Sequence, residues 1–364
     1  MPKHFPLSKE DIVRGRLQNQ QIAGAKFDKA EDVVRWLGAV QAQDFAAAIW
    51  AVGQRTNDIT NAMVEQTFAD GAILRTHILR PTWHFVAPED IHWMLKLTAP
   101  RVNAASAYQY RRLELDQAVF KRSNAIIEKT LRDGKQLARA ELGSALKKAG
   151  IPAIDLRLTY LVIRAELDGV ICSGARRGQQ FTYALLDERA SKSKVLARDE
   201  SLAELAERYF KSRGPATLQD FAWWSGLTMA DAKTGLEMVK SRFVHESLQG
   251  QVYWFSDSKS AGKESSLTVY LLPNFDEYVV GYTDRSAIFD ASDVKKPDTR
   301  GNVLFTHTMV VNGQIMGTWK RTLKAKTVEI ELNPFRPLTK TEKQTATDAV
   351  ERYGRFLDLQ VVLL

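Results

Sequence analysis

Two glutamines and an aspartate interrupt an apolar run in the first part of the chain. The run covers residues 37–50, LGAVQAQDFAAAIW, and its polar members are Gln41, Gln43 and Asp44. A buried amide without a hydrogen-bond partner costs roughly 1–3 kcal/mol, and sequences tolerate that cost where the amide faces a functional cavity. A second interpretation is that these side chains face solvent or cap a helix. The residue types alone leave both interpretations open.

The other residue types that commonly carry catalysis form no recognisable motif. Cys172 is the single cysteine, which excludes a disulfide framework and a cysteine-based metal site, and its surroundings predict a buried, inert thiol. His77 and His84 are the closest histidine pair, and no third ligand lies nearby in the sequence. No glycine-rich phosphate loop precedes a helix, and no Gly-x-Ser-x-Gly elbow is present. We therefore expect no nucleotide hydrolysis, no metal and no cofactor.

Composition and charge narrow the class of partner. The chain has 364 residues, which suggests about two to four domains. Its net charge of +8 favours polyanionic partners such as nucleic acids. No window approaches ~18 uninterrupted apolar residues, so we expect no membrane span. The first residues lack the long apolar core of a signal peptide, and together with the single cysteine this predicts a cytoplasmic location.

One pattern of elements recurs three times, and the third copy is the clearest. Its first helix covers 216–225 with Thr217 as the N-cap, and its second covers 229–240 with Thr228 as the N-cap. Residues 244–255 then alternate around Gln249-Gly250, which predicts a hairpin. A helix-turn-helix followed by a hairpin is typical of a winged helix.

The other two copies follow the same order with less regular spacing. Their helical segments are expected over 32–50, 60–70, 137–146 and 156–168, and their hairpins over 73–86 and 169–185. A further helix is expected from Ile91 to Leu97.

The composition changes to strand-like segments from about residue 265. These segments cover 267–272, 278–282, 303–311, 314–318 and 327–332, with Asn312-Gly313 as a type I′ turn and a final helix over 339–357. The predicted class is α+β, with three tandem winged-helix domains and a small C-terminal β-barrel-like domain. The expected domains are 1–110 (with an N-terminal helix), 111–192, 193–262 and 263–364.

Positive side chains on hairpins and strand ends predict contacts to DNA phosphates. A hairpin with positive tips can enter a groove of the duplex, although each cluster could also be an ordinary solvated turn or polar sheet face. The candidates are Arg75, His77, Arg80 and His84 on the first hairpin, Arg176 and Arg177 at the tip of the second, and Lys320 and Arg321 at a strand end.

Four motifs in this order carry a resemblance to a known family. They are VQAQ at 40–43, LRTHILRPTWHFV at 74–86, LLPNFDEYVVGYTDR at 271–285 and GQIMGTWKR at 313–321. Over nearly its whole length the chain resembles the AlkZ-like family of bacterial winged-helix proteins. The resemblance implies a DNA glycosylase that excises bulky alkylated purines and can unhook interstrand crosslinks. It also implies that Gln41 and Gln43 are the catalytic pair, in the Gln-aliphatic-Gln form of that family's motif.

The residue types suit this chemistry. A purine alkylated at N7 or N3 is already cationic and leaves without a general acid, so the enzyme has to place water at C1′ and stabilise a cationic sugar. Glutamine carbonyls can do both. Positions i and i+2 do not share a helix face, so joint action of Gln41 and Gln43 predicts a backbone that is extended or at a helix end.

The partner expected from these features is double-stranded DNA, alkylated or crosslinked, bound by a monomer associated with the nucleoid. Two other functions stay open on the sequence. Winged helices most often serve non-enzymatic DNA-binding proteins such as transcription regulators, and the wings could also be inert parts of a protein-binding scaffold.

Overall fold

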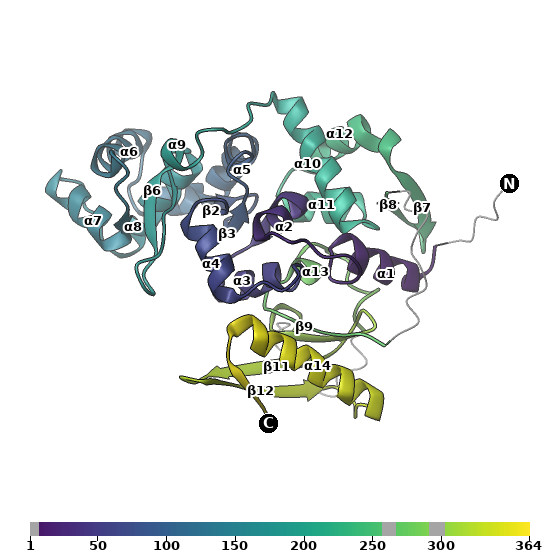
Figure 1. Cartoon of the computed structure of the whole chain (residues 1–364). Coiled ribbons are helices and arrows are strands. Elements are labelled where there is room, and N and C mark those ends of the chain that lie inside the picture. Colours follow the sequence, from purple (N-terminus) through teal and green to yellow (C-terminus); the bar gives the residue numbers. More distant parts are fainter. Residues whose placement is uncertain (1–6, 257–266, 291–302) are drawn as a thin grey trace.

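The computed structural model describes residues 7–256, 267–290 and 303–364 (Figure 1). The order helix, short strand, helix, helix, hairpin occurs in a first repeat and again in a second. The first repeat comprises α2 (Ala30–Leu37), β1 (Val40–Gln41), α3 (Phe45–Gly53), α4 (Asn61–Ala69), β2 (Leu74–Ile78) and β3 (Thr82–Val86). The second comprises α6 (Gln117–Leu131), β4 (Leu137–Ala138), α7 (Arg139–Lys148), α8 (Asp155–Leu167), β5 (Ile171–Ser173) and β6 (Thr182–Leu185).

The third repeat has the same order, except that an isolated bridge between Ala216 and Trp254 stands in place of the short strand. It comprises α10 (Arg198–Arg213), α11 (Leu218–Ser225), α12 (Met229–Val239), a short 3-10 turn (Lys240–Arg242), β7 (Val244–Leu248) and β8 (Gln251–Phe255). Among the described residues before the C-terminal part, three helices lie outside the repeats: α1 (Lys9–Asn19), α5 (Ile91–Arg112) and α9 (Leu186–Arg189).

The C-terminal part is built on one sheet and a long helix. Its elements are β9 (Val269–Leu272), α13 (Glu277–Val280), a 3-10 turn (Val303–Phe305), β10 (Thr308–Val311), β11 (Gln314–Leu323), β12 (Thr327–Pro334), α14 (Lys340–Leu357) and β13 (Gln360–Leu363). The strand order is β13-β12-β11-β10-β9, and β12 pairs in parallel with β13 while the other pairs are antiparallel.

Local sequence chemistry explains the elements that were predicted well. The Thr217 and Thr228 hydroxyls accept hydrogen bonds from the first turns of α11 and α12, as the N-cap prediction requires. Gln249-Gly250 has φ of 51° and 79°, and Asn312-Gly313 has 48° and 80°. Both pairs of positive angles are those of a type I′ turn, so the predicted turns and their hairpins are confirmed.

Several predicted elements differ from the structure. The helix expected over 91–97 continues to Arg112, and the helix expected from 137 begins only at Arg139, after β4. The helical periodicity over 32–50 is broken, because Gly38 at φ 74° ends α2 and β1 then pairs with β3. Residues 278–282 were expected as a strand, but the Asp276 carboxylate accepts from the Tyr278 N–H and caps the short helix α13 instead. The strand expected over 303–311 begins only at Thr308.

The predicted barrel is an open sheet within the described residues, with β9 and β13 as its edges. The sheet does not need to close on itself because α14 packs against both edge strands and supplies the apolar cover. Val350, Tyr353 and Phe356 of this helix lie in one hydrophobic core with Val269 and Leu271 of β9.

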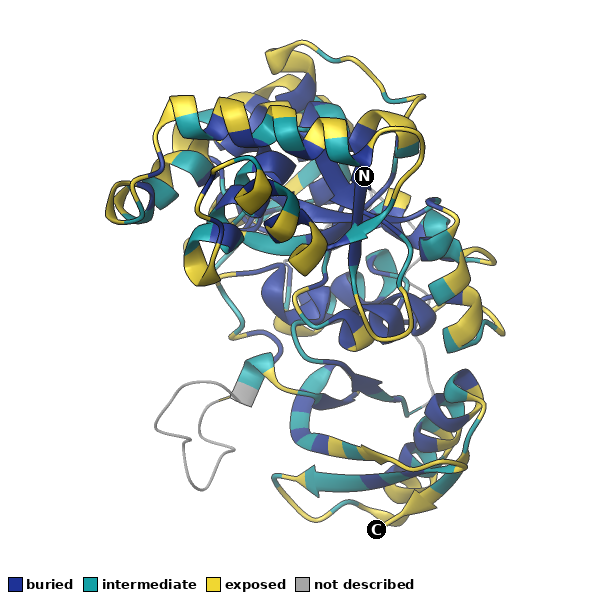
Figure 2. Cartoon of the chain, turned by 90° about the vertical axis from the view of Figure 1, so that its left-hand side faces the viewer, coloured by how far each residue is buried: buried dark blue, intermediate teal, exposed yellow. Residues whose placement is uncertain are grey.

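The hydrophobic cores join the first repeat to its neighbours. One core combines α2, α3 and α4 with the C-terminal sheet, and another combines the β2–β3 hairpin with α10, α11 and α12. The second repeat has a core of its own, at one end of the molecule in Figure 1. Buried residues concentrate on the inner elements and exposed ones on the outer helix faces (Figure 2). The first repeat is therefore held from several sides.

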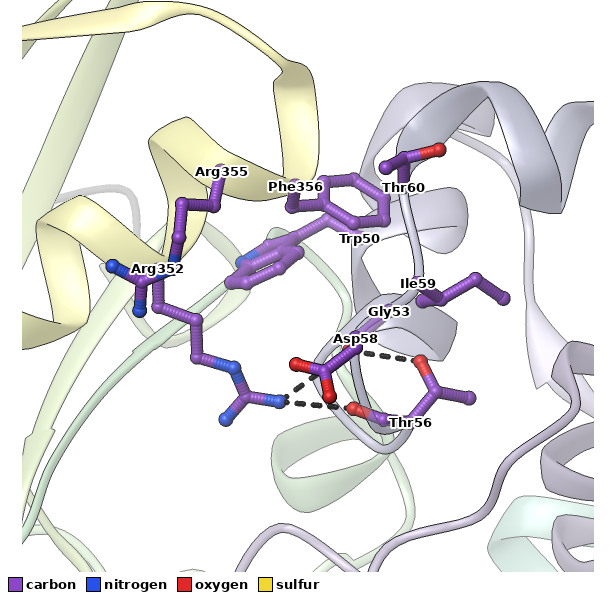
Figure 3. A pocket seen from close by; sticks show the side chains of 9 residues that line it. All are labelled: Trp50, Gly53, Thr56, Asp58, Ile59, Thr60, Arg352, Arg355 and Phe356. Atoms are coloured by element: carbon purple, nitrogen blue, oxygen red, sulfur yellow. Dashed lines mark hydrogen bonds between the residues drawn. The ribbon is translucent and has the colours of Figure 1, made fainter.

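Helix α14 of the C-terminal part packs against the first repeat, and a pocket of about 320 Å³ lies between them (Figure 3). The Arg352 guanidinium donates to the backbone carbonyls of Gln54 and Thr56 at 3.0 and 3.3 Å. The Trp50 ring packs against Phe356 with 4.8 Å between ring centroids. This attachment brings the loop after β9 close to the end of β1. No helix among the described residues is long and apolar enough to cross a membrane.

Candidate active site

The Gln41–Ala42–Gln43 segment lies between the end of β1 and the N-cap of α3, outside any helix, as the joint action of two glutamines requires. Gln41 ends β1, where it pairs with His84 of β3. Asp44 is the N-cap of α3, and its Oδ1 accepts from the Ala47 N–H at 3.1 Å. Two residues that a helix would turn to different faces therefore lie on one short non-helical segment that leads to a helix N-terminus.

Hydrogen bonds hold the backbone of this segment on both sides. The Gln41 N–H donates to Oε1 of Glu277 at 2.9 Å, and the Ala42 N–H donates to the Trp83 carbonyl at 2.7 Å. The Ala42 carbonyl accepts from Nε of Arg75 at 3.0 Å. These contacts come from a neighbouring hairpin and from the distant C-terminal part, so the segment is fixed by tertiary structure.

Asn274 secures the far end of the segment. Its Nδ2 donates to Oδ2 of Asp44 at 2.9 Å, so Asp44 binds both the start of α3 and the loop after β9. The Asp44 carboxylate is thereby occupied as a structural cap. This arrangement fits the interpretation that Asp44 caps a helix, while the two glutamines beside it are left for another role.

Glu277 is the centre of a fully buried polar cluster beneath the segment. Its Oε2 accepts from Nη2 of Arg213 at 2.6 Å and from Nε1 of Trp224 at 3.0 Å. Arg213 in turn donates to the carbonyls of Leu37 and Ala39 at 2.7 and 3.0 Å. A buried carboxylate and a buried guanidinium both need hydrogen-bond partners, and here they find them in each other and in the backbone of residues 37–41. The cluster therefore fixes the position of β1.

The two glutamine side chains have different surroundings. Oε1 of Gln41 accepts from Nη2 of Arg80 at 3.1 Å, and this side chain is half-buried. Gln43 is exposed, and its side chain makes no hydrogen bond to any residue that the structure describes. Gln43 therefore has a free amide at a rigidly held position, while the Gln41 carbonyl already has a cationic partner.

Three of the predicted DNA contacts on the first hairpin are buried. Arg75 lies between Trp83 and Phe181, 4.3 and 4.6 Å from their ring centroids, and burial lowers its pKa to about 10. His77 Nδ1 lies 2.5 Å from a carboxylate oxygen of Glu166. This burial does not fit direct phosphate contact, since a charged group reaching a phosphate needs an exposed surface. Arg75 instead supports the Ala42 carbonyl.

His84 is fully buried, with Nδ1 3.0 Å from the Thr82 carbonyl and no partner for Nε2 among the described residues. Burial, with Arg80 nearby, lowers the pKa of His84 from its usual 6.5 to about 3. His84 is therefore neutral at physiological pH and cannot contact a phosphate as a cation, which corrects the prediction for this residue.

The low pKa of His84 predicts an acid-sensitive fold. The unfolded chain takes up a proton near pH 6.5 and the folded chain only near pH 3, so stability is complete above 6.5 and falls as the pH drops toward 3. At about pH 5 the loss from this residue is about 2 kcal/mol. In urea titrations, His84→Gln should reduce the loss of unfolding free energy between about pH 7.5 and 5 by that amount. An unchanged pH dependence would assign the acid sensitivity to other groups.

The remaining predicted contacts lie at or near the surface. Arg80 is half-buried beside Gln41. Arg176 packs on Phe45 and Phe181 and forms a 3.4 Å ion pair with Glu65, which makes it a contact between the first two repeats. The more exposed candidates are Arg177, which pairs with Glu141, and Lys320, while Arg321 donates to the Tyr353 hydroxyl.

Sequence reasoning missed Arg213, Asn274 and Glu277, which position the segment, and Glu166, which contacts His77 and Trp83 of the neighbouring hairpin. Asn274 and Glu277 lie in the PNFDE part of a motif noted for its resemblance, where several polar residues follow an apolar strand. The polar residues at this place were the one sign in the sequence that Asn274 and Glu277 have a role in the site. Arg213 and Glu166 lie on amphipathic helices among other charged residues, and nothing in their local sequence distinguishes them.

Neither the single thiol nor a metal-binding cluster competes with the glutamine segment among the described residues. Cys172 is buried, and burial raises the pKa of its thiol to about 12, as expected for an inert residue. Across the described ranges, no three His, Cys, Asp or Glu side chains are grouped closely enough to hold a metal ion. The glutamine segment is therefore the strongest candidate site.

Comparison with known proteins agrees with this fold. The chain is 25% identical over 333 residues to an interstrand DNA cross-link repair glycosylase from Streptomyces sahachiroi, covering 84% of this chain and 85% of that protein. The solved structure of the Streptomyces sahachiroi DNA glycosylase AlkZ matches 99% of this chain and 100% of its own, with a TM-score of 0.78 at 20% identity, which shows a shared fold. Residues 34–356 match the family described as "DNA glycosylase AlkZ-like", and the chain therefore belongs to that family of DNA glycosylases.

Proposed function

We propose that this glycosylase excises bulky N-alkylated purines from double-stranded DNA and unhooks interstrand crosslinks, using water placed by the glutamine segment. The observation that carries the proposal is the exposed, unpartnered amide of Gln43 on a backbone held by Glu277, Trp83 and Arg75. The name of the Streptomyces sahachiroi relative supports a crosslink as one of the substrates.

The reaction needs little acid–base catalysis from the protein. The alkylated purine leaves with the electron pair of the glycosidic bond, which neutralises its ring, and the sugar becomes cationic at C1′. Water then adds to C1′ and loses a proton. The Gln43 carbonyl oxygen orients that water and presents the negative end of its dipole to the sugar, and a preorganised dipole needs no reorganisation as the charge develops.

Gln41 has a different role from Gln43 in this proposal. Its carbonyl oxygen accepts from Arg80, so its NH2 group is the part of the amide left to bind substrate or water. The Arg80 guanidinium holds the Gln41 side chain in one orientation. We therefore assign water placement to Gln43 and orientation of the sugar or the water network to Gln41.

We further propose that the three repeats are winged-helix domains, 1–110, 111–192 and 193–262, followed by a C-terminal domain over 263–364. The recurring order of helix, short strand, helix, helix and hairpin supports this division. Three different domains in one chain can contact one duplex without a second copy, so we propose binding as a monomer.

Arg177 and Lys320 are the exposed cations proposed to contact DNA phosphates, with lesser contributions from Arg176 and Arg321. Each phosphate contact releases a counterion, so Arg177→Ala and Lys320→Ala should each lower the slope of log affinity against log salt by about one. Fluorescence anisotropy over a salt series measures that slope. A slope identical to that of the wild type in both variants would place the DNA on another face of the molecule.

The test of the proposed function is a set of duplexes that carry either N7-methylguanine, a bulky N7-alkylguanine or an interstrand crosslink. We expect the wild-type protein to leave abasic sites, visible as strand breaks after alkali, on one or more of these and not on undamaged DNA. Tight binding to one undamaged sequence with no abasic product would instead indicate a regulator. Salt-insensitive or absent DNA binding would indicate a protein-binding scaffold.

A further inference from the structure

An apolar groove of about 420 Å³ lies between the first hairpin, α5 and α11. Its walls include Leu79 at the hairpin turn, Val102 of α5, and Ala222 and Leu227 at α11. The volume is in the range of small-molecule sites, roughly 300–1,000 Å³, which are likewise lined mainly by apolar side chains.

Two large apolar side chains at this groove are open to solvent. Trp223 and Met229 are each 46% exposed, on helices that bury most of their other apolar residues. An exposed indole and an exposed thioether together form a surface suited to flat aromatic groups, since both are polarizable and the indole face stacks.

Arg80 connects the groove to the glutamine segment. Its guanidinium carbon lies 5.4 Å from the centroid of the Trp223 ring, and the same guanidinium donates to Oε1 of Gln41 at 3.1 Å. Its Nε is buried without a hydrogen-bond partner among the described residues. A ligand stacked on Trp223 would therefore lie one side chain away from Gln41.

The two walls of the groove are held close together. A Cβ atom at Gly226 would lie 2.4 Å from the Leu79 carbonyl oxygen, so only glycine allows the end of α11 to approach the hairpin turn this closely. Gly226 also has φ 68°, which favours glycine. The groove is thus a fixed feature of the contact between the first and third repeats.

We propose that this groove binds the apolar, aromatic substituent of the alkylated purine while Gln41 and Gln43 act on its sugar. The inference rests on the proposed function and adds the position of the substituent. An unmodified base is recognised by hydrogen bonds along its edge, whereas this groove offers mainly apolar contact with Arg80 and Arg101 at its sides. Those two cations suit the phosphates that accompany the modified nucleotide.

The test compares two duplexes, one with N7-methylguanine and one with a guanine that carries a polycyclic aromatic group at N7. Trp223→Ala should lower kcat/KM for the aromatic adduct by about tenfold or more and change that for N7-methylguanine by less than about twofold. Trp223→Phe, which keeps a stacking face, should restore most of the difference. In fluorescence anisotropy, Trp223→Ala should likewise lose the tighter binding of the aromatic duplex relative to the N7-methylguanine duplex.

Matched variants on α12 separate the groove from general effects on the helix. Met229→Ala should weaken the preference in the same direction, while Met238→Ala, on the same helix, 44% exposed and outside the groove, should leave it unchanged. The inference would be overturned if Trp223→Ala lowered kcat/KM equally for both duplexes, or lowered it for neither. If the wild type releases neither base, the proposed function fails, and the binding preference still decides whether the groove holds the aromatic group.

Discussion

Gln43→Ala should lower the single-turnover rate of base excision by about 100-fold or more and leave the Kd for the same duplex within about twofold of the wild type. The side chain is exposed and makes no hydrogen bond within the described structure, so its removal costs no structural contact. In the proposed mechanism, what is lost is the oxygen that orients water and faces the sugar cation. Enzyme in excess over an N7-alkylguanine duplex gives the rate, and anisotropy gives the Kd.

Gln360→Ala is the matched control. Gln360 is also an exposed glutamine, and it lies on the last strand, β13, far from the segment in sequence. It should leave both the rate and the Kd unchanged. A Gln43→Ala protein that excises as fast as the wild type would remove Gln43 from the mechanism. A variant that loses binding and excision together would make Gln43 a DNA contact.

Glu277→Gln should reduce the free energy of unfolding by about 3 kcal/mol or more. Four donors, two from Arg213 and one each from Trp224 and the Gln41 backbone, converge on the Glu277 carboxylate, and both charged side chains are fully buried. A glutamine keeps the shape but leaves the Arg213 guanidinium without its counter-charge and turns an NH2 group toward one of the donors. Urea unfolding followed by fluorescence measures the loss.

The same variant should also slow excision, because the Gln41 N–H loses an acceptor that fixes β1. Glu351→Gln is the control: its ion pair with Arg355 is exposed, at 3.8 Å, and such pairs contribute less than about 1 kcal/mol. Unfolding free energies of Glu277→Gln and Glu351→Gln that agree within error would contradict the assigned role of the buried cluster.

The parts of the fold that were predictable from sequence are those fixed by neighbouring residues. The threonine caps at 217 and 228 and the type I′ turns at 249–250 and 312–313 each depend on a few adjacent side chains. The position of Gln41–Gln43 outside a helix, just before a helix N-terminus, was likewise predictable as a condition, since an i, i+2 pair cannot act from one helix face. These local rules located the hairpins and the candidate segment.

Burial and long-range partners were not predictable in this way. Arg75, His77 and His84 look like an exposed basic hairpin in the sequence, yet His77 contacts Glu166, which is 89 positions away. The short helix α13 resembles a strand in the sequence because Tyr278, Val279 and Val280 form a continuous apolar run that is fully enclosed, and only the Asp276 cap distinguishes it. A local pattern cannot show which residues the tertiary structure will enclose.

The role of Glu277 illustrates the same limit within the site. Its motif could be noted from the sequence. Its functional contacts, however, are to Arg213 of α10, 64 positions away, and to Gln41 of β1, 236 positions away. The catalytic candidates were therefore accessible from sequence and resemblance. The residues that hold them in place required the structure.

The most direct measurement is mass spectrometry of the small molecules released from a duplex that carries a single bulky N7-alkylguanine, with enzyme in excess. We expect the wild-type protein to release the intact alkylated base in an amount equal to the abasic sites formed, and Gln43→Ala to release almost none while bound to the same DNA. Wild-type protein that binds the duplex and releases no base, or Gln43→Ala protein that releases as much base as the wild type, would contradict catalysis by the glutamine segment.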